Sequence, residues 1–246
     1  MSNLKIYIYS HKDFVPPVQD SCYEILSETP ITKTSLKQHD VTTGDNIQRF
    51  GAAYGELKGL YWLYKNIKDL PDYIGFVHYR RYFSFMDNIP TSEELFGDSD
   101  IIIPISYKSH VSLVKQYAIG HNVNDLLDCC KIACKQNGTV CFTETLGQTL
   151  NQNNIYFCNA FIMKKEDFME YCKWLFEILF DFDNLRGFTD YNDVVKYVNG
   201  NQQFYKKPMY ELSYQYRLHG FIGERLFNIW LHYKFDKKKE YEFREI

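Results

Sequence analysis

The hydrophobic and polar positions of the chain alternate between the repeat of a strand and the repeat of a helix. Residues 4–9 alternate apolar and polar side chains one by one, which predicts a first strand. Apolar runs at 73–77, 100–105 and 156–163 predict three further strands. The last run contains Asn159, and a buried asparagine must be hydrogen-bonded to a loop or to a ligand.

Apolar side chains at helical spacing predict four helices, over 48–66, 111–136, 168–179 and from about 223 onward. Gly120-His121-Asn122 interrupts the second. Asp45 or Asn46 could cap the first helix, or the same amides could meet a phosphate. Residues 18–43 are expected to be irregular, and 183–219 are polar and aromatic, typical of an active-site or interaction segment. Alternating strands and helices predict an α/β fold with a mostly parallel central sheet.

Five polar and aromatic residues, His78-Tyr79-Arg80-Arg81-Tyr82, follow the strand at 73–77 directly. Ligands of open α/β sheets bind beyond the carboxyl ends of strands. Arginine grips phosphate oxygens and stays charged, so His78, Arg80 and Arg81 are predicted to form the diphosphate side of a nucleotide-sugar site. Adjacent residues leaving a strand point to opposite sides, so one arginine is expected to pair with a carboxylate instead. The alternative is a structural ion-pair cluster.

The first strand ends in a polar loop that begins Ser10-His11-Lys12. In α/β nucleotide-binding folds such a loop holds the base and the ribose, so the nucleotide is predicted to bind through Tyr9, Ser10, His11 and Asp45. The alternative is an ordinary surface loop. Later in the chain, Glu224 is a candidate general base for an acceptor hydroxyl, or a glutamate favoured by the helix dipole in a first turn.

Metal ligands are weakly indicated. The strings Asp98-Ser99-Asp100 and Asp181-Phe182-Asp183 resemble the Asp-x-Asp of metal-dependent glycosyltransferases, but no predicted strand delivers either one. The chain has no paired C-x-x-C for zinc. No metal ligand is therefore predicted, although Mn²⁺ or Mg²⁺ stays open as a cofactor.

Composition, charge and missing signatures limit the class of protein. The 246 residues contain no linker or repeat, which indicates one domain over 1–246, and the net charge of −3 argues against a nucleic-acid partner. The seven cysteines are odd in number and do not have the spacing of a disulfide framework, which indicates free thiols in a reducing cytosol. No signal peptide and no bilayer-spanning stretch are apparent, so a cytoplasmic protein is expected. P-loop, dinucleotide-binding and hydrolase signatures are absent.

Several stretches together resemble a bacterial family of capsular and exopolysaccharide biosynthesis proteins, long described as a domain of unknown function and regarded as glycosyltransferases. The matching residues are Ile6 to Lys12, Gly44-Asp45-Asn46-Ile47, Tyr61-Trp62, Lys65-Asn66, Tyr73-Ile74-Gly75, His78 to Phe83, Gln116-Tyr117, His121, Asn159 to Met163, Gly223-Glu224-Arg225-Leu226 and Trp230. The family pattern Asn-x-x-Tyr-x-Glu-Leu-Thr is altered here between Phe50 and Lys58, which keeps Tyr54 and Glu56 but changes a contact near residue 50.

The resemblance implies a GT-A-like fold, a nucleotide-sugar donor, UDP-linked galactose or galactofuranose, and a glycan acceptor growing on a polyprenyl carrier. It implies a donor half over 1–110 and an acceptor half over 111–246. The site residues expected are catalytic Glu224, His78, Arg80 and Arg81; donor-binding Tyr9, Ser10, His11, Lys12, Asp45, Asn46, Tyr54, Tyr79 and Tyr82; and acceptor-binding Gln116, His121, Asn159 and Arg225.

Two functions are alternatives to a glycosyltransferase. A non-catalytic glycan-binding or scaffold protein of a polysaccharide assembly complex would also lack a well-placed Asp-x-Asp. A nucleotidyltransferase would need a glycine-rich loop that residues 10–17 do not provide.

Lys234 and the lysines at 237–239 predict weak contact with the inner face of the plasma membrane, or else a solvated charged tail.

Overall fold

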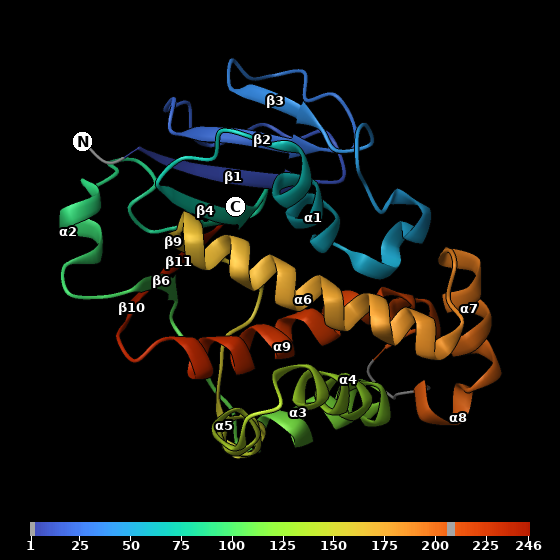
Figure 1. Ribbon diagram of the computed structural model, residues 1–246. Coiled ribbons are helices and arrows are strands. Elements are labelled where there is room, and N and C mark those ends of the chain that lie inside the picture. The colour runs from blue at the N-terminus through green and yellow to red at the C-terminus, as the bar shows by residue number, and fades with distance from the viewer. Residues whose placement is uncertain (1–2, 206–209) are drawn as a thin grey trace.

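The computed structural model describes residues 3–205 and 210–246, and in this part of the chain the centre is a nine-stranded sheet (Figure 1). Seven strands follow in the order β10-β6-β9-β4-β1-β2-β3, and β9 is antiparallel to both of its neighbours while the other pairs are parallel. β5 and β11 pair antiparallel beside β4. The predicted α/β fold with a mostly parallel sheet is confirmed. The strands are β1 (Leu4–Ser10), β2 (Tyr23–Ser27), β3 (Lys37–Asp40), β4 (Tyr73–His78), β5 (Arg81–Phe83), β6 (Ile101–Pro104), β9 (Phe161–Lys164), β10 (Lys238–Tyr241) and β11 (Phe243–Glu245).

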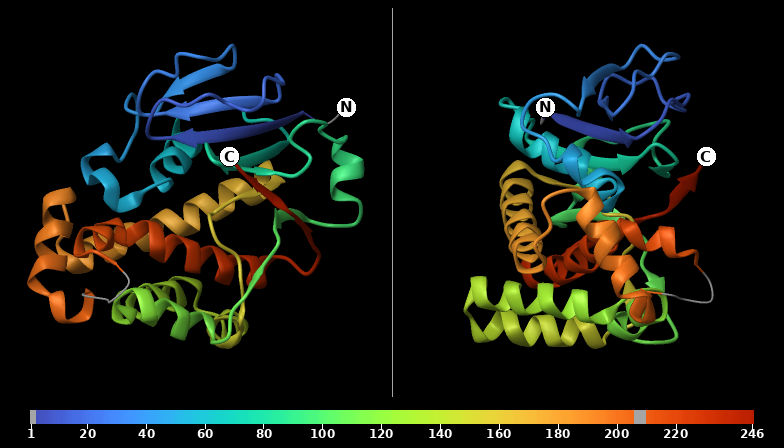
Figure 2. Two further views of the ribbon diagram at one scale, coloured as in Figure 1. Left: turned by 180° about the vertical axis from the view of Figure 1, so that it is seen from behind. Right: turned by 90° about the vertical axis from the view of Figure 1, so that its right-hand side faces the viewer.

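Helices cover one face of the sheet in two layers (Figures 1 and 2). The first layer contains α1 (Leu57–Asn66), α6 (Lys165–Arg186) and α9 (Leu218–Lys234). Beneath α6 and α9 lie α3 (Leu113–Gly120), α4 (Val123–Asn137) and α5 (Val140–Asn151). Shorter elements complete the chain: η1 (Gln48–Tyr54), α2 (Ser92–Phe96), α7 (Tyr191–Gly200), α8 (Gln202–Tyr205), η2 (Leu212–Arg217) and the strand pair β7 (Tyr107–Lys108) and β8 (Asn154–Ile155).

Both faces of the sheet are buried. Along β1, Tyr7 and Tyr9 pack into the large core under the helices, whereas Ile6 and Ile8 pack into a smaller core on the opposite face. The alternation predicted for this strand therefore holds, but its polar face is a tyrosine face covered by helices. Tyrosine suits this position because its ring buries a large apolar area and its hydroxyl keeps a polar end.

Two predictions for the first half of the chain are wrong in extent, and a predicted helix cap is also wrong. Residues 18–43 are not irregular, because they contain β2 and β3; β2 is buried at every position and β3 is a polar edge strand, so neither shows alternation. The helix expected over 48–66 is divided, since Gly51 (φ 50°) and Gly55 (φ 53°) take a backbone that a helix does not contain. Neither Asp45 nor Asn46 is an N-cap, because η1 begins after Ile47 and α1 after Glu56; Asn46 Oδ1 accepts from the N–H of Gln48.

The second half departs from the prediction in the same way. The strand expected over 156–163 begins only at Phe161, and residues 183–219 are largely helical apart from 206–209, which lie outside the described residues. The last helix begins at Leu218, so Glu224 does not stand in its first turn. The charged tail is not free, because it forms β10 and β11. Among the described residues no helix is long and apolar enough to cross a membrane.

Gly59 marks a close approach between α1 and β1 that can be tested. A Cβ at Gly59 would lie 2.3 Å from Cδ2 of Tyr9, so Gly59→Ala must displace that ring or the helix. We expect the free energy of unfolding, measured in urea, to fall by about 1–3 kcal/mol. Gly147→Ala is the matched control, because Gly147 also lies in a helix and a Cβ there meets nothing within 4 Å. It should gain up to about 1 kcal/mol from helix propensity. Equal gains in both variants would contradict the packing argument.

Candidate active site

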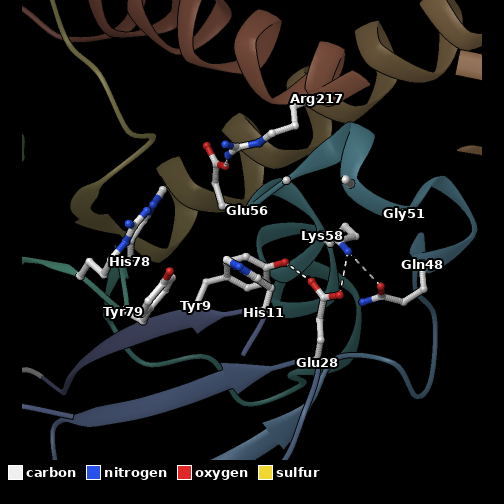
Figure 3. Close-up of a pocket in the computed structure, with 13 residues that line it drawn as sticks. Tyr9, His11, Glu28, Gln48, Gly51, Glu56, Lys58, His78, Tyr79 and Arg217 are labelled. Carbon is white, nitrogen blue, oxygen red and sulfur yellow. Dashed lines mark hydrogen bonds and ion pairs between the residues drawn. The ribbon is translucent and has the colours of Figure 1, made fainter. Parts of the chain in front are cut away.

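A cavity of about 490 Å³ opens where β1, β2 and β4 end (Figure 3). These three strands are parallel neighbours, so their carboxyl ends meet at one edge of the sheet. The opposite wall is formed by η1, the start of α1 and the end of η2. The lining residues are Tyr9, His11, Glu28, Gln48, Gly51, Ala52, Gly55, Glu56, Lys58, His78, Tyr79, Arg80 and Arg217.

One side of the cavity is a fixed polar network around Glu28, which follows β2. The Tyr9 hydroxyl donates to Glu28 Oε1, and Lys58 Nζ lies 2.8 Å from Glu28 Oε2. Lys58 also donates to Gln48 Oε1 at 3.2 Å. Burial, and then the negative charge of Glu28, raise the pKa of Tyr9 well above its ordinary value, so this hydroxyl stays a donor.

The other side is organised around Glu56, which directly precedes α1 and is 5% exposed. Its Oε1 accepts a hydrogen bond of 2.8 Å from Asn159 Nδ2. Its Oε2 lies 4.0 Å from Nη2 of Arg217, whose side chain is 46% exposed. Figure 3 shows Glu56 and Arg217 together on one side of the cavity, away from Glu28. Within residues 3–205 and 210–246 this carboxylate has one hydrogen bond and one loose ion pair, so its buried charge is incompletely compensated.

Tyr79 contacts basic side chains in and beside the lining of the cavity. The Arg80 guanidinium lies 5.1 Å from the centroid of the Tyr79 ring, and the His11 ring meets the same ring edge-on at 5.5 Å. Arg80 is exposed, and no described carboxylate lies within ion-pair distance of it. Its charge is therefore available to an anion in the cavity.

His78, in the cavity lining, and Glu224, outside it, are two half-buried titratable groups whose charges influence each other. Part of His78 reaches the surface, but its Nε2 is buried without a hydrogen-bond partner among the described residues. Burial lowers the pKa of His78 to about 4, with Arg81 and Arg217 acting in the same direction against Glu224. Burial raises the pKa of Glu224 despite the adjacent Arg225. His78 is accordingly neutral at pH 7.

The structure brings five of the predicted site residues into the cavity: Tyr9, His11, His78, Tyr79 and Arg80. Arg81 points elsewhere. Its Nε lies 2.9 Å from Glu245 Oε1, and its Nη1 donates to Cys158 Sγ at 2.6 Å. Arg80, in the turn between β4 and β5, thus lines the cavity, whereas Arg81, at the start of β5, pairs with a carboxylate, as expected for one of the two arginines.

Six residues expected to bind the donor lie outside the lining of the cavity and make contacts within the chain. Tyr54 donates to Asp183 in the core at 2.6 Å, and the Tyr82 hydroxyl donates to the Tyr79 carbonyl. The others hold the two loops in shape: Ser10 bonds the Lys12 backbone, Lys12 Nζ lies over the Tyr79 ring, Asp45 accepts from Tyr61, and Asn46 donates to the carbonyls of Thr42 and Gly44.

The residues expected to bind the acceptor also lie outside the lining of the cavity. Arg225 donates to Gln116 Oε1 at 2.7 Å and lies 2.6 Å from Glu224 Oε2. His121 Nδ1 lies 2.9 Å from Gln215 Oε1. Asn159, expected within a strand, instead lies in the turn before β9 and reaches Glu56.

Several lining residues were not predicted. Glu28 follows a strand that the pattern did not reveal, and Lys58 lies in a helix predicted only for packing. Arg217 was indicated indirectly, because it lies within the polar and aromatic stretch 183–219 that was expected to be an active-site or interaction segment. The positions at which the chain departs from the family pattern, including Gly51 and Lys58, line this cavity.

The donor set does not fit a bound divalent cation. Among the described residues no three His, Cys, Asp or Glu side chains come together to hold a metal ion. In the cavity, Glu28 and Glu56 already have Lys58 and Arg217 beside them. Asp183 of the second Asp-x-Asp string is buried between Tyr54 and His219.

The comparisons with known proteins give one family and one fold. The family model described as a domain of unknown function, DUF4422, matches residues 5–203. No curated protein sequence matches the chain. Among solved structures, the chain is similar to the apo structure of the bifunctional glycosyltransferase WbbM, with a TM-score of 0.70 and 24% sequence identity over 99% of this chain and 45% of that one. This chain thus spans less than half of WbbM, and the likeness shows the fold.

The buried state of His78 predicts a pH-dependent stability. The unfolded imidazole takes up a proton near its ordinary pKa of 6.5, whereas the folded one does so only near 4, so falling pH favours the unfolded chain. Between pH 7 and pH 5 the wild type should lose about 2 kcal/mol more than His78→Asn, measured by urea unfolding. His110→Asn, which removes an exposed histidine, should keep the wild-type pH dependence. A His78→Asn variant with the wild-type slope would contradict the assignment.

Proposed function

The chain belongs to the DUF4422 family, and from this premise we propose that it is a glycosyltransferase that moves a sugar from a nucleotide-diphosphate donor to a growing glycan. The observation that carries the proposal is the presence of Arg80 and Arg217 in one cavity at the carboxyl edge of a parallel sheet. This edge is where α/β folds bind their ligands. The name of the fold neighbour WbbM supports the same chemistry.

The two arginines suit the leaving group of such a reaction. When the bond between the sugar and the nucleotide breaks, negative charge develops on the departing diphosphate. Arginine can meet phosphate oxygens with two parallel hydrogen bonds and remains charged throughout. Arg80 and Arg217 come from distant parts of the chain, so the proposed site forms only when the chain is folded. The cavity volume of about 490 Å³ is in the range of small-molecule sites.

The finer assignments rest on the resemblance. We propose a UDP-linked donor, carrying galactose or galactofuranose, with the nucleoside directed toward Tyr9 and His11. The acceptor would be a polyprenyl-linked capsular or exopolysaccharide glycan. Residues 1–110 would then supply most of the donor side, and 111–246 the acceptor side together with Arg217.

A location at the cytoplasmic membrane surface would follow from the lipid-linked acceptor more than from the tail. Lys234 pairs with Glu170, Lys239 donates to the Glu94 carbonyl, and Lys238 donates to the Phe235 carbonyl. These lysines are thus partly engaged within the chain, which would weaken any attraction to anionic lipid.

Nucleotide binding tests the proposal directly. Arg80→Ala and Arg217→Ala should each raise the Kd for UDP about 10-fold or more, because a hydrogen bond to a charged group contributes about 1.5–3 kcal/mol. Calorimetry with UDP, GDP and ADP, with and without Mn²⁺, measures this. Arg244→Ala is the matched control, since Arg244 is an exposed arginine paired with Asp87 outside the cavity.

Two outcomes would count against the donor site. If Arg80→Ala and Arg217→Ala both keep the wild-type Kd, the arginines do not bind the diphosphate. If the wild type binds no nucleotide but binds a glycan, the result supports the alternative of a non-catalytic glycan-binding protein. An affinity that depends strongly on Mn²⁺ would show that the ligand completes a metal site that the protein residues alone do not form.

A further inference from the structure

Two consecutive residues in the turn before β9 have a backbone conformation that side chains rarely adopt. Cys158 has φ 78° and Asn159 has φ 37°, and among the described residues they are the only non-glycine residues with positive φ. Both are buried. Such a conformation costs on the order of 1–3 kcal/mol per residue and persists where the surroundings enforce it, commonly at functional sites. Strand β9, which begins at Phe161 between β4 and β6, fixes one end of this turn.

This turn holds two glutamates from distant elements. The Cys158 N–H donates to Glu224 Oε1 at 3.1 Å, and Asn159 Nδ2 donates to Glu56 Oε1 at 2.8 Å. The other amide atom of Asn159, Oδ1, has no hydrogen-bond partner among the described residues. The hydrogen bond to Glu56 is therefore the contact that the strained backbone of Asn159 gives its side chain.

The two glutamates differ in what remains free. Glu224 has a partner on each oxygen, with Arg225 Nη1 at 2.6 Å on Oε2, and it does not line the cavity. Glu56 lines the cavity, and among the described residues its Oε2 has only Arg217 beside it, at 4.0 Å. A carboxylate offers about four lone-pair positions, so Glu56 keeps acceptor capacity that a hydroxyl in the cavity could use. Of the two, Glu56 has the geometry of a base and Glu224 that of a structural ion pair.

We propose that Glu56 is the general base of the transfer reaction and that Asn159 is the residue that positions it; this rests on the proposed function. The acceptor hydroxyl gives its proton to Glu56. Its oxygen forms a bond to the anomeric carbon while the bond from that carbon to the diphosphate oxygen breaks. The electron pair leaves with the diphosphate, which faces Arg80 and Arg217. This is a direct displacement, so the configuration at the anomeric carbon is inverted.

The test separates the chemical step from donor binding. UDP-galactose and UDP-galactofuranose serve as donors, with water or an alkyl galactoside as acceptor, and release of UDP gives kcat and KM. Glu56→Gln should lower kcat at least about 100-fold, the usual range for a general base. Its Kd for UDP, measured by calorimetry, should stay within about threefold of the wild type. Glu177→Gln, on the exposed side of α6, is the control and should keep the wild-type kcat.

Asn159→Gly tests the positioning role, because glycine accepts the positive φ while the amide is removed. It should lower kcat about 10-fold and leave the KM for donor unchanged, which a general loss of structure would not do. If Glu56→Gln fails to fold, Glu56→Asp replaces it. That variant keeps the charge but withdraws the carboxylate, and it should lower kcat with an unchanged Kd for UDP.

The outcomes distinguish this inference from the proposed function. A folded Glu56→Gln variant that keeps more than a third of the wild-type kcat, or a product with retained anomeric configuration, overturns the role of Glu56 and leaves a glycosyltransferase. A large loss of UDP affinity in Glu56→Gln makes Glu56 a donor ligand and not the base. A wild type that binds no nucleotide and releases no UDP removes the proposed function, and the inference with it.

Discussion

The register of three parallel strands is the constraint on which the cavity depends. β1 pairs on one side with β2, where Ser10 lies opposite Ser27, and on the other side with β4, where Tyr9 lies opposite His78. These pairings bring the next residues of each strand, among them Glu28, to one edge. A shift of one residue would turn every side chain of a strand to the other face. The buried tyrosines and isoleucines of β1, which pack into separate cores, make that shift costly.

The second wall of the cavity depends on two glycines in an otherwise helical stretch. Gly51 and Gly55 adopt positive φ, so the chain turns through η1 and begins α1 afresh at Leu57. As a result Gly51 and Gly55 line the cavity together with Glu56 and Lys58, whereas one continuous helix over 48–66 would spread these positions around its axis. Glycine can take this backbone without the steric cost that a side chain would add.

Alternation predicted β1, and apolar runs bounded by polar residues predicted β4 and β6. The prediction that one of Arg80 and Arg81 would pair with a carboxylate also agrees with the structure. β2 escaped prediction because the buried Glu24 interrupts its apolar residues, and β3 because a polar edge strand has no apolar repeat. Glu28, which follows β2, was therefore not predicted either. The contact between Glu56 and Asn159 spans 103 residues and depends on a rare backbone at Asn159, so no local pattern could indicate it.

The charges of the cavity explain how buried carboxylates and an anionic donor could share one site. Lys58, Arg80 and Arg217 face Glu28 and Glu56, so the lining has three cations against two carboxylates. Lys58 is held by Glu28 at 2.8 Å, whereas Arg217 is only loosely associated with Glu56 at 4.0 Å. A diphosphate would therefore compete for Arg217 and not for Lys58. Since the same arginine faces both the carboxylate and the proposed leaving group, donor binding would be coupled to the orientation of Glu56, while Asn159 holds the other oxygen in place.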